Sequence, residues 1–291
     1  MMTFEELVNT SKTSKTPLHE VVCEWYMMNT GDDPQNALKT SLRLTNEMFN
    51  SFEARKSNPS KSLTGWVGEN DQKVRNSSPF LLSQIVYSGI EVALSMAEHN
   101  ASMGKIVACP TAGACGVVPG ALISMHKNLG KSVEELSHSL LVAGAVGERI
   151  RRKASISGAV SGCQAEIGTA TAMASAAIVY AVSPENYEAL VSAPALALKS
   201  LLGLVCDPVG GFVEIPCVKR NAFGVSTAFT AAELALAGIE SVIPFEEVAE
   251  SLGRVGRRLP EELKETGKGG IAVTQTAREM LTKFLGVDRR R

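Results

Sequence analysis

Residues 167–182 read IGTATAMASAAIVYAV, an uncharged stretch in which Ala, Thr and Ser outnumber the large apolar side chains. The stretch is apolar enough for a protein interior, but it is shorter than the roughly 20 apolar residues that a membrane span needs. Small side chains suit helices that approach one another closely, whereas strands favour β-branched and aromatic residues. The stretch therefore predicts a buried helix.

The rest of the sequence also predicts an all-α, mainly helical fold. Aromatic residues make up only 5% of the chain, and 211–215 is the best short candidate for a strand. Capping boxes, in which a hydroxyl residue is followed three positions later by Glu, predict helix starts at Thr3, Ser132 and Thr276. Pro184 stands where a first helical turn is expected. The predicted helices cover 3–12, 17–29, 34–55, 79–99, 119–129, 132–149, 163–181, 184–202, 224–239, 244–257 and 275–285.

The polar segment 56–78 divides the chain. It is rich in Ser, Asn, Lys and Gly, and it is long for a loop inside a compact domain, which indicates either a functional loop or a linker. We therefore expect an N-terminal helical segment over 1–55, the polar loop or linker over 56–78, and a larger helical catalytic domain over 79–291. One continuous domain is the alternative.

Charge and cysteine content exclude several classes of protein. The chain has 29 basic and 30 acidic residues among 291, so it lacks the basic excess of a nucleic-acid or anionic-membrane binder. Its first residues show no basic region followed by an apolar run, so no secretory signal is expected. Six cysteines in a chain of this kind do not predict a disulfide scaffold. We expect a cytoplasmic protein whose cysteines are core residues, redox thiols or metal ligands.

Four segments interrupt the helical pattern and are candidates for function. They are rich in Gly and hydroxyl residues, and each leads into a predicted helix: 108–120, 153–163, 203–221 and 265–276. Loops on a rigid helical scaffold are common places for binding and catalysis. The free N–H groups at a helix start also favour anions such as a carboxylate.

Three cysteines stand inside these segments: Cys163, Cys206 and Cys217. None belongs to a C-x2-C pair, which disfavours structural zinc. Three thiolates are one fewer than the four that saturate an iron–sulfur cluster, so a cluster held by them would keep one iron open. An isolated cysteine is more often a small buried apolar residue. Spacing alone leaves both interpretations open.

The remaining candidate side chains are weaker. Cys109 and Cys115 flank the PTAGA turn and are expected to pack there, although a redox or ligand role stays open; Cys23 is expected in the core. The four histidines fall in predicted helices or at their ends and do not gather in the Gly-rich segments: His19, His99, His126 and His138.

Together the four segments carry a resemblance to a known family. Their sequences are ACPTAGACGVVPG, ASISGAVSGCQAEIG, GLVCDPVGGFVEIPCVKRNA and ETGKGGIAVTQTARE. In order and spacing they resemble the iron–sulfur-dependent L-serine dehydratases (L-serine ammonia-lyases), and most closely the α subunit of the two-chain form. The likeness covers nearly the whole chain and is strongest from about 104 to 279.

The resemblance implies a helical catalytic chain that binds a [4Fe–4S] cluster through three cysteines. By motif the ligands are Cys163, Cys206 and Cys217. The implied substrate-binding residues are Thr111, Ala112, Gly113, Ser155, Ser157 and Gly158. The open iron would act as a Lewis acid on L-serine, which is converted to pyruvate and ammonia.

The resemblance also implies a partner. In the family, histidine motifs of the SSSHT and GHGT types belong to the β part, and this sequence contains neither. The general base is therefore expected on a β subunit, and the enzyme is expected to be an oligomer. Lys153 stands where relatives often have Asn, and the basic end 288–291 has no family role that we can assign.

Two other functions stay open. The chain could be a non-catalytic subunit that binds the cluster without turning over serine. It could also be an amino-acid lyase that uses pyridoxal phosphate, with Lys153 as the Schiff-base residue. The scarcity of alternating strands and helices disfavours that second alternative, because such enzymes generally have α/β folds.

Overall fold

The stretch 167–182 does form the central helix of the protein. The computed structural model describes residues 2–286. In it α9 (Thr169–Val182) contacts α6, α7, α10 and α11, and almost all of its side chains are buried. The longer run Gln164–Val182 could cross a membrane by length and composition alone, but 89% of its most apolar part is buried inside the protein. A core helix passes the same test.

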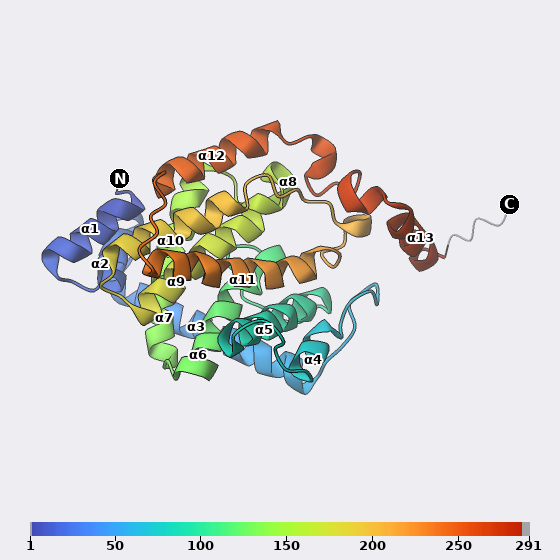
Figure 1. Cartoon of the computed structure of the whole chain (residues 1–291), viewed down its shortest axis with the longest axis horizontal. Coiled ribbons are helices and arrows are strands. Elements are labelled where there is room, and N and C mark those ends of the chain that lie inside the picture. The colour runs from blue at the N-terminus through green and yellow to red at the C-terminus, as the bar shows by residue number, and fades with distance from the viewer. Residues whose placement is uncertain (1, 287–291) are drawn as a thin grey trace.

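The all-α prediction is confirmed. The structure is 71% helical, and no strand forms within residues 2–286. Figure 1 shows the helices gathered around α9, with α13 at one end. The α-helices are α1 (Phe4–Ser14), α2 (Leu18–Thr30), α3 (Pro34–Ser57), α4 (Asn70–Arg75), α5 (Gln84–Ala101), α6 (Val117–Leu129), α7 (Val133–Lys153), α8 (Gly158–Ser161), α9, α10 (Tyr187–Ser200), α11 (Cys217–Leu236), α12 (Phe245–Arg258) and α13 (Gln275–Phe284). Short 3-10 turns lie at Ala112–Ala114, Val209–Gly211, Glu261–Leu263 and Gly270–Val273.

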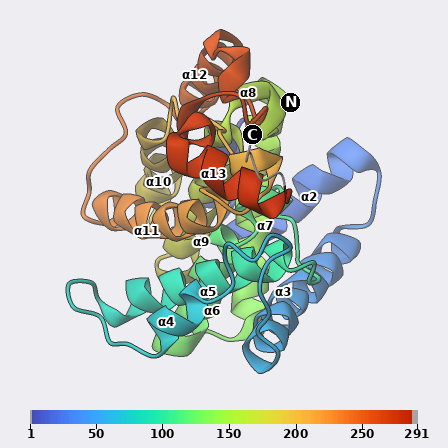
Figure 2. The ribbon, with the colours of Figure 1, turned by 90° about the vertical axis from the view of Figure 1, so that its right-hand side faces the viewer.

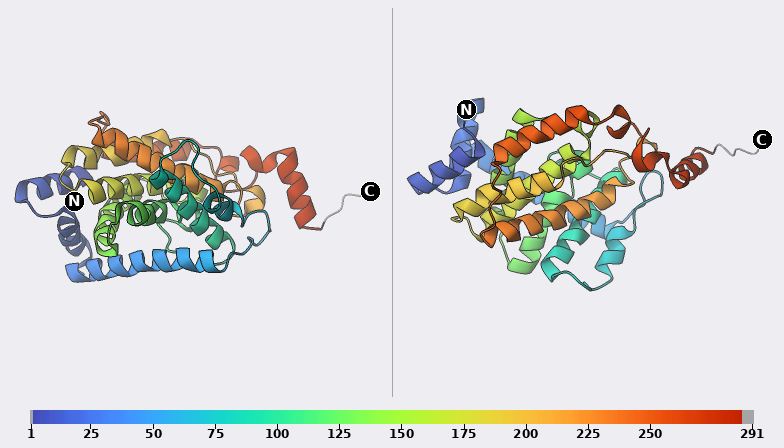
Figure 3. Two further views of the ribbon diagram at one scale, coloured as in Figure 1. Left: turned by 60° about the horizontal axis from the view of Figure 1, so that its bottom comes forward. Right: turned by 45° about the horizontal axis from the view of Figure 1, so that its top comes forward.

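The other helices build outward from α9. α6, α7, α10 and α11 pack directly on it, α5 packs on α6 and α11, and α12 packs on α7 and α10, as Figures 1 and 2 show together. The long α3 runs along the outside of the bundle and contacts α5 and α7 (Figure 3). The two segments that carry the three cysteines, 153–163 and 203–221, lead into α9 and α11.

Helix starts follow local hydrogen bonding. The capping boxes at Thr3 and Ser132 are both present, each with its Glu three residues later. The box predicted at Thr276 is wrong, because the Thr274 hydroxyl accepts the Ala277 N–H instead; α13 begins at Gln275, where the predicted range 275–285 starts. The start predicted at Pro184 is also wrong: the Asn186 side chain caps α10.

Other predicted boundaries also shift. The strand candidate 211–215 is wrong, since a 3-10 turn and irregular backbone occupy it. α11 begins at Cys217, seven residues before the prediction of 224, and α6 begins at Val117 rather than 119. A helix was expected to continue from 163, but a π-helical turn over Gln164–Gly168 precedes α9. A π turn widens the helix by one residue, and such turns are frequent at functional sites.

A buried charged cluster holds the polar segment 56–78. The Arg55 guanidinium donates to both Asp71 oxygens at 3.1 Å and to Glu98 at 3.1 Å, and all three side chains are fully buried. Arg55 also donates to the carbonyls of Ser60 and Gly68. Burial raises the pKa of Glu98. Burial also acts to raise the pKa of Asp71, but hydrogen bonds from Arg55, Glu98 and Ser95 together with the Arg55 charge outweigh it and lower that pKa. The segment is therefore tied to α3 and α5 by a saturated set of contacts.

The same segment reaches the cysteine-bearing loop before α11. Buried Glu214 accepts hydrogen bonds from the Ser62 hydroxyl at 2.6 Å, the Thr64 hydroxyl at 2.5 Å and the Thr64 N–H at 3.2 Å. Trp66 packs edge-on against Phe212, with ring centres 5.9 Å apart. The division of the chain at 56–78 stays a prediction.

Candidate functional site

The three predicted ligands come from separate elements and meet at one place. Cys163 directly precedes the π turn that leads into α9, Cys206 lies in the loop after α10, and Cys217 is the first residue of α11. All three thiols are buried and none forms a disulfide. The three cysteines are therefore far apart in sequence but near one another in the structure.

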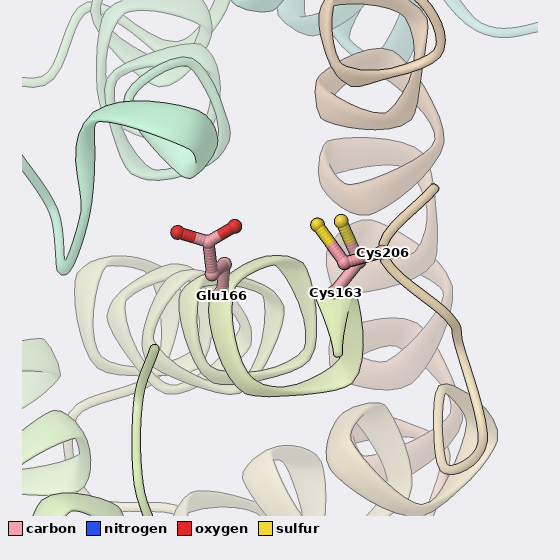
Figure 4. Close-up of side chains that lie close together, drawn as sticks. All are labelled: Cys163, Glu166 and Cys206. Carbon is pink, nitrogen blue, oxygen red and sulfur yellow. The ribbon is translucent and has the colours of Figure 1, made fainter. Parts of the chain in front are cut away.

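Glu166 joins this group. The sulfur atoms of Cys163 and Cys206 and a carboxyl oxygen of Glu166 lie within 4.8 Å of one another. Figure 4 shows the two sulfurs side by side and the carboxyl group projecting from the same side of the turn. Cys217 lies close enough for its charge to act on Cys206 and for the charge of Cys163 to act on it. Two thiols, a carboxyl group and a nearby third thiol are a plausible set of metal ligands.

The thiols are not equivalent. A hydrogen bond from Cys206 lowers the pKa of Cys163 against the effect of burial, and the nearby Arg220 lowers it further. The hydrogen bond to Cys163 and burial raise the pKa of Cys206, and burial raises that of Cys217. The thiolate is the form that binds metal, and these surroundings favour it at Cys163.

Two glycines stand directly against the Glu166 carboxyl group. A Cβ atom on Gly113 would lie 3.1 Å from Glu166 Oε2, and one on Gly158 would lie 2.8 Å from Oε2 and 3.2 Å from the sulfur of Cys206. Burial raises the pKa of Glu166, while the neighbouring Thr111 hydroxyl acts in the opposite direction. That hydroxyl is itself buried and has no hydrogen-bond partner of regular geometry. The PTAGA and SISGA segments therefore approach the thiols through residues without side-chain bulk.

Asn221, one turn into α11, fixes the PTAGA loop against the cysteines. Its side-chain N–H2 donates to the carbonyls of Gly113 at 2.9 Å and Cys217 at 3.0 Å, and its oxygen accepts the Gly116 N–H at 2.8 Å. Asn221 is itself buried. One amide thus joins the first residue of α11 to the loop that enters α6.

The other two segments are joined just as closely. The Cys206 N–H donates to the Leu263 carbonyl at 2.9 Å, and the Glu265 N–H donates to the Cys206 carbonyl at 2.7 Å. Asp207 accepts the Ile271 N–H at 2.8 Å and pairs with Arg220, also at 2.8 Å. Segments predicted separately over 108–120, 153–163, 203–221 and 265–276 therefore converge around the thiols.

The predicted substrate residues are not equally close. Thr111, Gly113 and Gly158 lie beside Glu166, as described above. Ala112 is exposed at the surface of the loop. Ser155 and Ser157 are half-buried, and the Ser155 hydroxyl accepts the Ser157 N–H at 3.1 Å.

The other cysteines and Lys153 have different surroundings. Cys109 and Cys115 are buried, and burial raises the pKa of each to about 12. Cys23 is buried in α2, as expected. Lys153, the candidate Schiff-base residue, forms an ion pair with Glu250 at 2.7 Å. That ion pair gives the pyridoxal phosphate alternative no support.

The four histidines contact groups outside the site. His19 stacks on His138 with ring centres 3.9 Å apart and lies 2.7 Å from the Tyr180 hydroxyl. The ring of His126 lies 2.7 Å from the Lys131 carbonyl. His99 packs against Gly104, where a Cβ would collide with the imidazole ring. A cavity of about 600 Å³ between α2, α3 and α7 has Cys109 in its wall but none of the three cysteines that meet Glu166.

Sequence reasoning missed Glu166, Arg220 and Asn221. Glu166 follows Cys163 by three residues, a spacing that places both on one face of a helical turn. Arg220 and Asn221 follow Cys217 by three and four residues and have the same relation to it. The signal was present, but a lone Glu or Asn in a helical stretch has no distinguishing pattern.

Comparison with known proteins supports one family. Residues 6–272 match the family model of the serine dehydratase alpha chain. The chain is 46% identical over 228 residues to a probable L-serine dehydratase alpha chain of Bacillus subtilis. The alignment covers 77% of this chain and 76% of that protein. It is 41% identical over 210 residues to the L-serine dehydratase alpha chain of Peptoniphilus asaccharolyticus, with 72% of each chain covered.

A longer relative matches over part of its length. An L-serine dehydratase of Helicobacter pylori is 40% identical over 185 residues, which are 62% of this chain and 40% of that protein. With most of the present chain matched by the family model and the α-chain relatives aligned over more than two thirds of their own length, this protein is a member of the serine dehydratase alpha-chain family.

Proposed function

We propose that this chain is the α chain of an L-serine ammonia-lyase, which converts L-serine to pyruvate and ammonia. The observation that carries the proposal is the grouping of the Cys163 and Cys206 sulfur atoms with the Glu166 carboxyl group beside two glycine-bearing loops, with Cys217 near enough for its charge to act on Cys206. The family relatives named for this reaction support it. The side chains grouped at the site and the names of the relatives therefore support the same activity.

A [4Fe–4S] cluster held by Cys163, Cys206 and Cys217 is the cofactor that we propose. The residues present fit it: three free buried thiols come together, Arg220 favours the thiolate form of Cys163, and Gly158 leaves space beside Cys206. Bound through three thiolates, the cluster would supply a Lewis acid with one iron free of protein ligands. The part of the chain over 79–291 contains all these residues.

The chain's own residues would bind and orient the substrate. The PTAGA turn, Thr111 to Gly113, offers backbone N–H groups and the Thr111 hydroxyl beside Glu166, which suit a carboxylate. Ser155 and Ser157 in the SISGA segment offer further hydroxyl groups. Asn221 would keep the PTAGA loop in place during turnover, because it bonds to both sides of the loop. Packing of four loops around the thiols would exclude bulk water.

The reaction also needs a base that removes the α proton of serine. Loss of this proton and of the hydroxyl group gives aminoacrylate, which tautomerises and hydrolyses to pyruvate and ammonia. Within residues 2–286 the four histidines contact groups away from the thiols. We therefore propose that a β subunit provides the general base and that the working enzyme is an oligomer of both chains in the cytoplasm.

The direct test is an anaerobic assay of pyruvate formation from L-serine. The chain would be reconstituted with iron and sulfide and assayed alone and with a candidate β chain. We expect turnover only with both chains. Full activity of the α chain alone would contradict the shared site, and cluster binding without turnover in the complete complex would instead favour a non-catalytic subunit.

A further inference from the structure

Cys206 has less backbone support than the other two proposed ligands. Cys163 directly precedes the π turn that leads into α9, and Cys217 is the first residue of α11, so a helix positions each of them. Cys206 lies in the loop after α10, where an isolated β-bridge pairs it with Lys264. Loops open locally more readily than helices unless other contacts hold them. The place of the Cys206 sulfur atom therefore depends on what holds this loop.

The Arg220 side chain holds the loop on both sides of Cys206. Its Nη1 group donates to the Val205 carbonyl at 2.9 Å, and its Nη2 group donates to the Asp207 carboxylate at 2.8 Å. Val205 directly precedes Cys206 in the chain, and Asp207 directly follows it. The guanidinium is a rigid, planar fork, so it can hold two acceptors in one fixed arrangement. A single side chain therefore fixes both neighbours of the thiol-bearing residue.

The ion pair between Arg220 and Asp207 is largely shielded from water. The Asp207 side chain is 3% exposed and the Arg220 side chain is 16% exposed, and salt screens such partly buried pairs much less than it screens surface pairs. The second Asp207 oxygen accepts the Ile271 N–H at 2.8 Å, and a Cβ on Gly270 would collide with that oxygen. The ion pair therefore also fixes the segment 265–276 against the Cys206 loop.

Arg220 stands on the helix that presents another ligand. It follows Cys217 by three residues, so both side chains lie on one face of the first turn of α11. The guanidinium also lies beside the Cys163 sulfur atom. Contacts from Arg220 thus connect α11 with the loop that carries Cys206. Resting on the proposed function, we propose that Arg220 is a positioning residue, which holds Cys206 in place relative to Cys217 and thereby keeps the cluster bound.

The test compares iron release and thiol accessibility in four chains. They are the wild-type chain, Arg220→Met, Arg220→Lys and Lys219→Met, which removes an exposed cation from the same turn of α11. After anaerobic reconstitution, a chelator removes iron, and the decay of the visible absorption gives the rate. Separately, maleimide labels the thiols of the chain without cluster. Mass spectrometry then gives the labelling rate of Cys206 and that of Cys23, a buried thiol in α2.

We expect Arg220→Met to release iron about 10- to 100-fold faster than the wild-type chain, since loss of a residue that orients a metal ligand typically lowers metal affinity by that factor. Cys206 should be labelled faster, whereas the labelling rate of Cys23 should stay unchanged. Arg220→Lys keeps the positive charge but not the planar fork, so its rates should lie between those of the wild type and Arg220→Met. Lys219→Met should behave as the wild type.

Two results would overturn the proposal. Iron release at the wild-type rate in Arg220→Met would show that the cluster does not depend on this side chain. Faster labelling of Cys23 together with Cys206 in both Arg220→Met and Arg220→Lys would show that Arg220 supports the whole fold rather than one ligand.

Asp207→Asn repeats both measurements if Arg220→Met does not fold, because it nearly keeps the side-chain shape and weakens the same ion pair. It should raise the rates of iron release and of Cys206 labelling, and unchanged rates would overturn the proposal. Failure of the proposed function is distinct from these results. It would appear in the wild-type enzyme as absence of pyruvate formation, whereas the labelling rates are measured without the cluster.

Discussion

Glu98 and Glu166 are two acids with different surroundings: Glu98 is fully buried, and Glu166 is half-buried. Glu98 receives the Arg55 guanidinium, the N–H groups of Gly68 and Asn70 and the Asn70 side chain, so its own chain satisfies it fully. Glu166 adjoins Gly113, Gly158, the thiols of Cys163 and Cys206 and the Thr111 hydroxyl group. The first arrangement fastens a loop, and the second places a carboxyl group beside the proposed cluster ligands. The two acids therefore differ in how completely neighbouring cations and N–H groups surround them.

The largest expected effect comes from the thiols grouped near Glu166. Cys163→Ala, Cys206→Ala and Cys217→Ala should each abolish the broad iron–sulfur absorption of the reconstituted chain and, with it, pyruvate formation. Each variant removes one of only three proposed protein ligands. Absorption spectra and iron analysis under anaerobic conditions would measure the loss.

Cys115→Ala is the control for these variants. Cys115 is also buried, but its thiol lies 3.6 Å from the Met96 carbonyl rather than beside Glu166. The Cys115→Ala variant should retain the cluster. If all three ligand variants kept a complete cluster, the ligand assignment would be wrong.

In the buried cluster around Glu98, Arg55→Met should lower the free energy of unfolding by about 3–5 kcal/mol. The variant leaves Asp71 and Glu98 buried without the Arg55 guanidinium. Urea denaturation of the apo-chain would measure this change. Arg254→Met is the matched control: Arg254 pairs with Glu250 at 3.9 Å on the exposed surface, and its loss should have no measurable effect. A small change for Arg55→Met would mean that the cluster does not fasten the segment 56–78.

Gly158→Ala should affect function more than stability. Its Cβ would meet Glu166 Oε2 at 2.8 Å and the Cys206 sulfur at 3.2 Å, so the reacting groups must shift. We expect kcat/KM for L-serine to fall by about 10- to 100-fold, because small displacements of aligned groups have large effects on rate.

Gly144→Ala supplies the control for this change. Gly144 lies inside α7, and an added Cβ meets nothing within 4 Å. It should leave kcat/KM unchanged and the helix at least as stable. Equal activity of the two variants would show that the close approach of Gly158 to Glu166 is not needed for activity.

The smallest effect concerns the half-buried, stacked pair His19 and His138. Burial, aided by the charge of the stacked His138, lowers the pKa of His19 from 6.5 to about 4. The unfolded state therefore takes up a proton first as the pH falls. Stability should be greatest above pH 6.5 and should decrease between about pH 6.5 and 4, by at most about 3 kcal/mol.

Denaturation of the apo-chain at several pH values would measure this decrease. His19→Gln should make it shallower, because the variant cannot take up that proton. An unchanged slope in the variant would assign the acid sensitivity to other groups. Since His19 contacts Tyr180 and His138 rather than the thiols, the variant should keep its cluster.

Local patterns were sufficient for most of the helices. The capping boxes at Thr3 and Ser132 and the apolar stretch 167–182 depend on neighbours in sequence, and all three predictions are confirmed. Predictions failed where a competing local contact decided the boundary, as when Thr274 caps α13 in place of Thr276. The strand predicted at 211–215 failed because the short turn there is held by other segments, for example by Ser62 and Thr64 on Glu214.

The candidate site was only partly predictable. The three cysteines and the segments around them were identified by their motifs, and the structure brings these segments together. Glu166 could not be identified in this way, because its role depends on Gly113 and Gly158, which are 53 and 8 residues away in sequence. Arg220 and Asn221 likewise acquire meaning only when their partners in other loops are known.

The Asn221 amide has one more consequence, which concerns repair. Its three hydrogen bonds join the Cys217 carbonyl to both sides of the PTAGA loop, and none of them passes through iron. Iron–sulfur centres with an open iron are vulnerable to oxidants, and their thiols can be damaged once exposed. A chain that lost the proposed cluster would keep these three hydrogen bonds, so the place for a new cluster would survive. Iron and sulfide could then restore the cluster without synthesis of a new chain.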